Sequence, residues 1–327
     1  KSSAASDVYK RQIWWLLCHY EWYRYHGNKA YLEQSRDYIT ALLRQLMTQI
    51  APDGQECLDG TRFLDWPSNS NKDAIAAGLQ ALMVWGMRVG VEFAELFEDR
   101  QLSNDCKAAE KKLVKAASKV YKKFLASCPA PDAPGSKQVT ALMTITGLID
   151  APKADKEFLS INGAQGFSTF YGYYMLEAMA MAGNYQGALD VIREYWGAMI
   201  DLGATSFWED FDINWIPNAA PIDELVPEGK KDIHGDCGAY CYVGFRHSLC
   251  HGWASGPTSW LSRHILGVEV IEPGCRQVRI TPHLGDLQWV KGTFPTPYGE
   301  LQIYHEKQAN GNVISEVKAP KGVSVIK

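Results

Sequence analysis

The sequence predicts a mainly helical protein that ends in a small antiparallel β domain. Two observations support this fold class. Between residues 13 and 266 apolar residues recur at helical spacing, and segments that are apolar on nearly all sides alternate with segments that are apolar on one face. From residue 267 to residue 327 apolar residues recur at every second position, as in strands with one buried face. The alternation favours two helical layers, as in an α/α barrel of helical hairpins, with a plain helical bundle as the alternative.

The N-terminal residues stand apart from this pattern. Residues 7–12 read DVYKRQ, the translation of GAT GTG TAT AAG AGA CAG, which is a transposon end used to fragment DNA for sequencing. We therefore expect residues 1–12 to be a translated artefact, with a genuine polar leader as the alternative. On this interpretation the natural protein begins further upstream, and the chain is a fragment of it.

Long helical segments of two kinds follow. Some carry apolar residues along a single stripe, which predicts helices with one exposed polar face. These are residues 31–50, 104–126 and 186–200. Residues 74–89 and 167–182 are apolar on nearly all sides, which predicts buried helices. Residues 258–266 complete the helical part as a short helix, because Pro257 suits a first helical turn and Gly267 a helix end.

Two connections between these helices are long and contain glycine and proline. Residues 51–71 include the sequence LDWPSN, and residues 203–253 separate the last two predicted helices. Loops of this length in a compact domain usually carry function. Beyond them, Val278 and Ile280, like Leu301 and Ile303 and like Val323 and Val325, alternate with polar neighbours. Turns such as PHLGD, PTPYG and NGN separate these runs, which predicts a β domain of sandwich or jelly-roll type.

Composition narrows the classes of function. The net charge of -4, with both signs interspersed, gives no footprint for nucleic acid, and a neutral or carbohydrate ligand fits better. The sequence contains no run of about 18 apolar residues, so it predicts no membrane span. The eight cysteines are scattered, which predicts mostly free, buried thiols. His234, Asp236 and Cys237 lack a second pair at metal-ligand spacing, so we expect neither a metal nor a cofactor.

Acidic and aromatic residues are interleaved in residues 203–215, GATSFWEDFDINW. Aromatic rings stack on the apolar faces of sugars, while carboxylates bind hydroxyl groups and move protons in glycosidic cleavage. An aromatic core segment with solvated acids at its edge is the alternative. In an extended segment Glu209 and Asp210 would face opposite sides, with Asp210 on the side of Trp208.

Four motifs in order resemble the C-terminal half of the α-L-rhamnosidases of glycoside hydrolase family 78. They are GATSFWEDFD, IDELVPEGKKDIHGD, GFRHSLCHGWASGPTSWLSRHILG and PHLGDLQWVKGTFPTPYGEL, and LDWPSN matches more loosely. The resemblance implies part of an (α/α)6 catalytic barrel over residues 13–266 and a C-terminal β-sandwich over residues 267–327. It also implies an inverting exo-glycosidase that removes terminal α-L-rhamnosyl residues from a glycoside or polysaccharide, in the periplasm or outside the cell.

The resemblance also implies roles for single residues. Glu209, in TSFWE, matches the family's T-x-W-E motif with one residue of difference and would be the general base that activates water. His251, in LCHGW, would contact a sugar hydroxyl or the base, and Asp65 and Trp66 would line the sugar pocket. The remaining predicted substrate-binding residues are Trp208, Asp210, Asp212, Trp215 and Trp253. The family's general acid has no counterpart, because its motif would lie before residue 1.

Two alternatives stay open at this point. The first is another α/α-barrel glycosidase, such as a trehalase-like or unsaturated-uronyl hydrolase. The second is a carbohydrate-binding homologue that has lost the general acid and does not catalyse.

Overall fold

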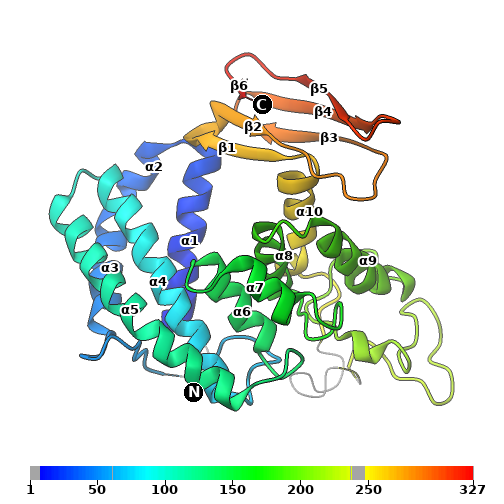
Figure 1. Ribbon diagram of the computed structural model, residues 1–327, viewed down its shortest axis with the longest axis horizontal. Coiled ribbons are helices and arrows are strands. Elements are labelled where there is room, and N and C mark those ends of the chain that lie inside the picture. Colours follow the sequence, from blue (N-terminus) through cyan, green and yellow to red (C-terminus); the bar gives the residue numbers. More distant parts are fainter. Residues whose placement is uncertain (1–7, 61, 236, 238–246, 327) are drawn as a thin grey trace. The chain divides into compact units, whose positions relative to one another are not determined.

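The computed structural model describes residues 8–60, 62–235, 237 and 247–326, and within them it is mainly helical with two three-stranded sheets (Figure 1). The chain forms two compact units. The terminal unit comprises Lys1–Phe63, Ala76–Phe124 and Leu261–Lys327, and the central unit comprises Leu64–Ile75 and Leu125–Trp260. The prediction of a mainly helical chain with strands confined to the C-terminal part is confirmed.

The terminal unit begins with three helices. They are α1 (Val8–His26), α2 (Lys29–Gln34) and α3 (Arg36–Thr48). The single helix expected over residues 31–50 is two helices, because Ser35 ends α2 and begins α3. Helix α1 was not among the predicted helical segments, and it includes residues 8–12, which the sequence sets apart.

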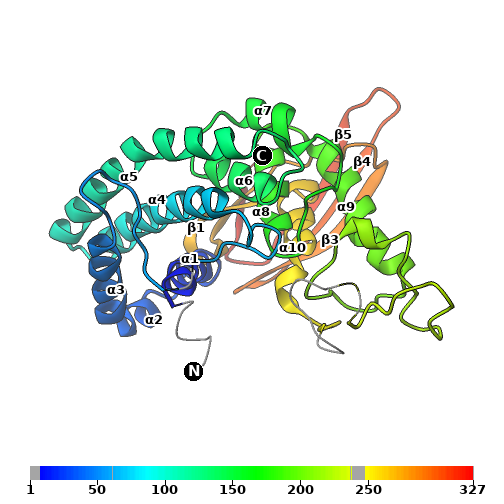
Figure 2. The same ribbon diagram turned by 90° about the horizontal axis from the view of Figure 1, so that it is seen from below.

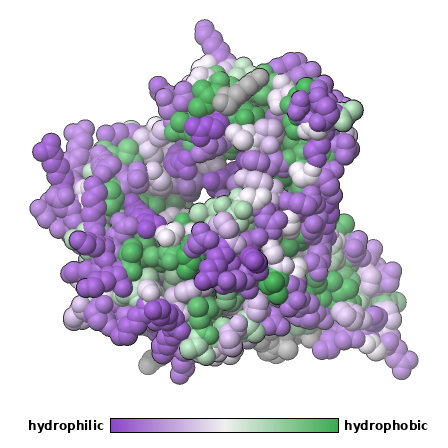
Figure 3. All heavy atoms as spheres, in the orientation of Figure 1, coloured by the Kyte–Doolittle hydropathy of each residue, from purple (hydrophilic) through white to green (hydrophobic). Residues whose placement is uncertain are grey.

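The two longest helices follow, and both were predicted with shorter bounds. Helix α4 (Lys72–Leu96) is buried along most of its length, as expected from its apolar composition. By length and composition α4 could also cross a membrane, yet 78% of its apolar window is covered inside the protein, as in the central helix of a globular domain. Helix α5 (Arg100–Ser127) buries one stripe and exposes a lysine-rich face, which forms part of the hydrophilic surface in Figure 3.

The C-terminal strands form two sheets in the terminal unit. In one sheet β1 (Val268–Glu272), β2 (Gln277–Ile280) and β6 (Ser324–Ile326) lie in the order β1-β2-β6. In the other, β3 (Trp289–Thr296), β4 (Gly299–Lys307) and β5 (Val313–Lys318) form an antiparallel meander. Three of the four strand pairs are antiparallel, as predicted, and the exception is β6, which pairs with β2 in parallel. The chain reaches β6 only after passing through the whole second sheet, and such a long connection permits parallel pairing.

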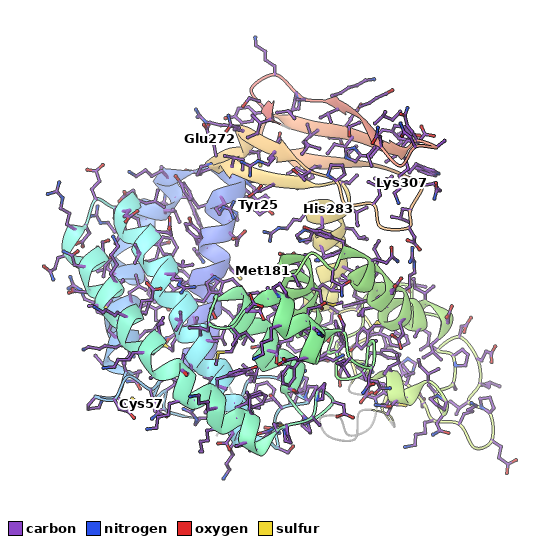
Figure 4. All side chains as sticks on the ribbon, in the orientation of Figure 1. Tyr25, Cys57, Met181, Glu272, His283 and Lys307 are labelled. Atoms are coloured by element: carbon purple, nitrogen blue, oxygen red, sulfur yellow. The ribbon has the colours of Figure 1, made fainter. Side chains whose placement is uncertain are left out.

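One hydrophobic core joins the two sheets. Val278 and Ile280 from the first sheet and Leu301 and Ile303 from the second belong to the same buried cluster. These are the alternating residues that predicted the strands. Tyr25, at the end of α1, packs against this cluster, and Figure 4 shows it beside the strands.

The central unit is built around α8 (Tyr171–Met181), which contacts α6, α9 and α10 (Figure 2). Helices α8 and α9 (Tyr185–Asp201) match the predicted segments, and α10 (Gly256–Trp260) with the π-helical turn η5 (Leu261–Ile265) matches the short last helix. Helix α6 (Ser136–Ile145) was missed, because its polar first turn is buried. The short elements are α7 (Ala151–Ala154), η2 (Asp155–Leu159), η3 (Ile213–Trp215), η4 (Gly252–Ala254) and η6 (Pro273–Cys275), the last of them in the terminal unit.

Candidate functional site

All the predicted site residues lie in the central unit. Asp65 and Trp66 lie in the loop before α4, and the other residues lie in the long connection between α9 and α10. Two backbone hydrogen bonds hold two parts of that connection side by side. The amide of Glu209 donates to the carbonyl of Ser248 at 2.8 Å, and the amide of His251 donates to the carbonyl of Phe207 at 2.7 Å. The acidic motif and the histidine motif are therefore neighbours.

Glu209 is held mainly by its backbone. Its carbonyl oxygen accepts hydrogen bonds from the Thr169 hydroxyl at 2.6 Å and from the Trp253 indole N–H at 2.7 Å. Its half-buried carboxylate accepts one hydrogen bond, at Oε2, from the Ser248 amide at 3.3 Å. Oε1 makes no hydrogen bond within the described part of the chain. A carboxylate oxygen in that state can accept a proton from water.

His251 and Trp253 complete the group around Glu209. Their ring centroids lie 4.4 Å apart, and Phe170 lies 5.8 Å from the Trp253 ring. Trp253 is 38% exposed, so its ring offers a surface on which a sugar can stack. The structure therefore brings together three residues that the sequence predicts for one site: Glu209, His251 and Trp253.

Trp208 and Asp210 lie beneath this group. Trp208 is fully buried and Asp210 is 1% exposed, and Trp208 packs edge to face against Phe211. Asp212 accepts a hydrogen bond from the Asn214 amide at 2.9 Å and so caps the short helix η3. Trp208 and Asp210, both predicted to bind substrate, are therefore buried, whereas Asp212 is only partly buried.

Trp215 follows on η3 and is partly buried. Its ring contacts Phe211 and His247 edge to face, at centroid distances of 5.9 and 6.0 Å. The aromatic residues of the motif therefore pack largely on one another. This is the arrangement that the alternative reading of the motif, an aromatic core segment with acids at its edge, also describes.

Asp65 is likewise bonded within the protein. It is 6% exposed, and its Oδ2 accepts hydrogen bonds from the Ser168 hydroxyl at 2.5 Å and from the Gln138 amide group at 3.2 Å. Its Oδ1 accepts from the amide of Trp66, which is half-buried, at 2.9 Å. Because Thr169 follows Ser168 and bonds to Glu209, Asp65 is connected to the candidate base through two consecutive hydroxyl residues.

Several supporting residues were not predicted from the sequence. Buried Lys137 donates to the carbonyls of Ile161 and Gly163 at 2.8 and 2.7 Å, and burial lowers its pKa to about 8. The buried hydroxyl of Tyr195 donates to the carbonyl of Phe211, and burial together with the Asp210 carboxylate raises the pKa of this tyrosine. His247 bonds to the backbone of Asp210. The sequence around Lys137 and His247 gives no local signal that would have singled them out.

Each residue considered as a metal ligand either is engaged or buried within the protein or lies outside the described residues. His234 bonds to Asp232 through Nδ1 at 2.7 Å. Asp236 falls outside the described residues, and Cys237 is buried. Of the seven cysteines within the described part, four are buried and three are exposed.

Comparison with known proteins identifies the family resemblance. Residues 267–326 match the bacterial alpha-L-rhamnosidase C-terminal domain. A rhamnosidase of glycoside hydrolase family 78 from Bacillus sp. GL1 superposes with a TM-score of 0.74 and 22% identity, over 96% of this chain and 32% of the other. The Streptomyces avermitilis alpha-L-rhamnosidase complexed with L-rhamnose superposes with a TM-score of 0.66 and 18% identity, over 93% of this chain and 28% of the other.

The Aspergillus terreus alpha-L-rhamnosidase gives a TM-score of 0.68 and 16% identity, over 94% of this chain and 35% of the other. At these identities the likeness concerns the fold. The chain spans about a third of the length of these proteins. No curated protein sequence matches it. The resemblance to the α-L-rhamnosidases of family 78, indicated by the sequence motifs, is confirmed.

Proposed function

We propose that this chain is part of an inverting exo-α-L-rhamnosidase in which Glu209 is the general base. The carrying observation is the half-buried Glu209 carboxylate, with Oε1 unbonded among the described residues, beside His251 and the exposed ring of Trp253. In this proposal the helices form part of an (α/α)6 barrel and the strands form a C-terminal β-sandwich. The rhamnose bound to the Streptomyces avermitilis relative supports a rhamnose-containing glycoside or polysaccharide as the substrate.

The proposed chemistry is a single displacement at the anomeric carbon. Glu209 takes a proton from water as the water oxygen attacks, and a second carboxyl group protonates the leaving oxygen from the opposite face. In inverting glycosidases the two groups are about 6.5 to 9.5 Å apart, which leaves room for the water. We propose that the second group is supplied from outside residues 1–327.

The neighbours of Glu209 would divide the remaining tasks. The Trp253 ring would stack on the sugar, and the His251 imidazole would bind a hydroxyl group. Asp65, Trp208 and Asp210 are buried or fully bonded, so we assign them to the support that fixes the loops. Trp66 and Trp215, which are partly buried, would close the sides of the pocket.

The replacement Glu209→Gln tests the proposal in the full-length protein that contains this chain. The amide cannot accept the water proton, so we expect turnover of an aryl α-L-rhamnoside to fall by roughly a thousandfold or more with little change in KM. Asp212→Asn is the matched control, because its carboxylate caps η3 and should affect turnover far less. Near-normal turnover of the Glu209 variant would exclude it as the base.

Two further measurements separate the proposal from its alternatives. Proton NMR of the first product should show β-L-rhamnose, because inversion converts the α linkage to the β anomer. Release of glucose or an unsaturated uronic acid instead, from the matching substrates, would favour another α/α-barrel glycosidase. Rhamnoside binding without turnover would favour a non-catalytic homologue.

A further inference from the structure

His247 links two segments of the candidate site from a buried position. It is 6% exposed, and its Nδ1 lies 2.9 Å from the carbonyl oxygen of Ile233. Its Nε2 lies 3.1 Å from the backbone nitrogen of Asp210. A carbonyl oxygen only accepts and a backbone N–H only donates, so Nδ1 must carry the proton and Nε2 must be bare. The two partners therefore define one neutral tautomer.

The same part of the chain also holds Glu209. Ser248, the next residue, accepts a hydrogen bond from the Glu209 amide at 2.8 Å and donates one to Glu209 Oε2 at 3.3 Å. Two consecutive residues, 247 and 248, thus fix the backbone of two consecutive residues, 209 and 210. The His247 ring also packs edge to face against Trp208, at a centroid distance of 6.3 Å.

We propose that His247 is a positioning residue for Glu209, and that it performs this task only as the neutral tautomer with the proton on Nδ1. Protonation in acid would place a second N–H donor against the Asp210 amide, so the hydrogen bond would be lost and a charge would be buried. The backbone that carries Glu209 would then loosen. The importance of Glu209 rests on the proposed function, whereas the tautomer and the acid response can be tested without it.

The charged groups around the ring set the pH at which this occurs. Among the described residues the charged or titratable side chains that act on His247 are Glu209, from the acidic motif, and His234, which is itself bonded to Asp232. Burial is the largest influence and lowers the pKa of His247 below its ordinary value of 6.5. The Ile233 carbonyl and the Glu209 carboxylate act against burial, whereas the Asp210 amide, which donates to an unprotonated Nε2, favours the neutral form. The neutral form of His247 therefore predominates at neutral pH. We expect the hydrogen bond from the Asp210 amide to be lost below pH 6.5.

Nitrogen NMR of the full chain with labelled histidine tests the tautomer directly. At pH 7.5 we expect the His247 signals of a proton on Nδ1, assigned by their loss in His247→Gln. On acidification the signals should titrate below pH 6.5, and amide-exchange protection of Asp210 should fall by about tenfold with the same midpoint. The proposal would be overturned by a proton on Nε2 at pH 7.5. It would also be overturned if the amide-exchange protection of Asp210 stayed constant while His247 titrates.

Two variants connect this result to catalysis in the full-length enzyme. Glutamine can donate to Ile233 and accept from Asp210 without titrating, so His247→Gln should keep most of the turnover and shift or remove the acid limb of the pH profile. His247→Leu should lower kcat by about tenfold or more with little effect on KM. His305→Gln is the matched control, because His305 is also a buried imidazole with two partners but lies on β4 in the terminal unit.

The outcomes separate the two proposals. An unchanged acid limb in His247→Gln, or equal kcat in His247→Leu and the wild type, would overturn the positioning role even if Glu209→Gln abolishes turnover. Retained turnover in Glu209→Gln would overturn the proposed base, while the tautomer and the protection of Asp210 would still stand or fall by NMR. If His247→Leu does not fold, the wild-type titration and the glutamine variant still decide.

Discussion

At the scale of single residues, the backbone of Glu209 is fixed more firmly than its carboxylate. Its amide and its carbonyl oxygen are both bonded, the latter to Thr169 and Trp253 at once. The carboxylate has one long contact, at 3.3 Å. A general base needs this combination, because the side chain must be aimed by rigid neighbours and yet keep an oxygen for water.

Replacing Thr169 tests how much this backbone support contributes. Thr169→Val has nearly the same shape but cannot donate to the Glu209 carbonyl, so we expect a loss of about 1 kcal/mol in the free energy of unfolding. Turnover of the full-length enzyme should fall as well, since Glu209 loses one restraint. Urea unfolding and steady-state kinetics measure the two effects. Thr169→Ser keeps the hydroxyl and should lie close to wild type; equal losses in both variants would point to the methyl group instead.

The candidate site could be predicted from the sequence only where local chemistry is visible. Glu209 and the aromatic residues around it are conspicuous because acids and aromatic rings are interleaved in one motif. Trp253, which bonds to Glu209, was predicted as a site residue. Thr169 and Ser248, which also bond to Glu209, and His247, which bonds to the Asp210 amide, could not be predicted, because folding brings them there and they carry no sequence signal of their own. The burial of Trp208 and Asp210 could not be predicted either, since an extended segment shows which residues share a side but not what covers it.

At the scale of elements, the helices were predicted well where their apolar pattern is long. Helices α4, α5 and α9 differ from the predicted segments mainly at their ends. Helix α6 was missed because Ser136, Lys137 and Gln138 read as surface residues but are all buried. Two of them bond across the unit: Lys137 to the segment before α8, and Gln138 to Asp65. Apolar spacing cannot predict a helix whose buried face contains polar residues that are bonded to distant parts of the chain.

Lys137 gives this arrangement a measurable pH dependence. Its pKa is about 8 in the folded state, lowered from 10.5 chiefly by burial. Between these two values the unfolded state binds more protons than the folded state, so the free energy of unfolding should rise with pH across this window. The slope is at most about 1.4 kcal/mol per pH unit. Below pH 8 the buried charge lowers the free energy of unfolding by a constant amount, and above about pH 10.5 this destabilisation is absent.

The variant Lys137→Met isolates this effect from other titrating groups. We expect the wild type to gain stability relative to the variant as the pH rises from about 8 to 10.5, measured by urea unfolding at several pH values. Lys115→Met, on the exposed face of α5, is the control and should show a flat difference. A flat or falling difference for Lys137 would mean that its pKa is not lowered.

At the scale of the whole molecule, each compact unit combines segments from distant parts of the chain. The terminal unit joins the N-terminal helices to the C-terminal strands, although the central unit lies between them in sequence. The Arg24 guanidinium donates to the carbonyl of Val270 at 2.6 Å, and the ring of Tyr25 lies 6.0 Å from that of Phe294. Neither contact can be read from hydrophobic spacing, which reports on each element alone. The strands and α1 should therefore unfold together.

Tyr25→Ala tests whether the N-terminal helix and the strand domain form one cooperative unit. The ring is partly buried against the core shared by both sheets, so its removal leaves a gap and should cost about 2 kcal/mol in the free energy of unfolding. The loss should appear equally in far-ultraviolet circular dichroism, which follows the helices, and in the amide exchange of β3 and β4, which follows the strands. Tyr38→Ala, where the ring is 51% exposed, should cost less than half as much. If amide exchange and circular dichroism instead report separate transitions, and only the strand signal shifts, α1 and the strands would be independent. A single shifted transition would show that the strand domain is stabilised by a helix more than 240 residues away in the chain.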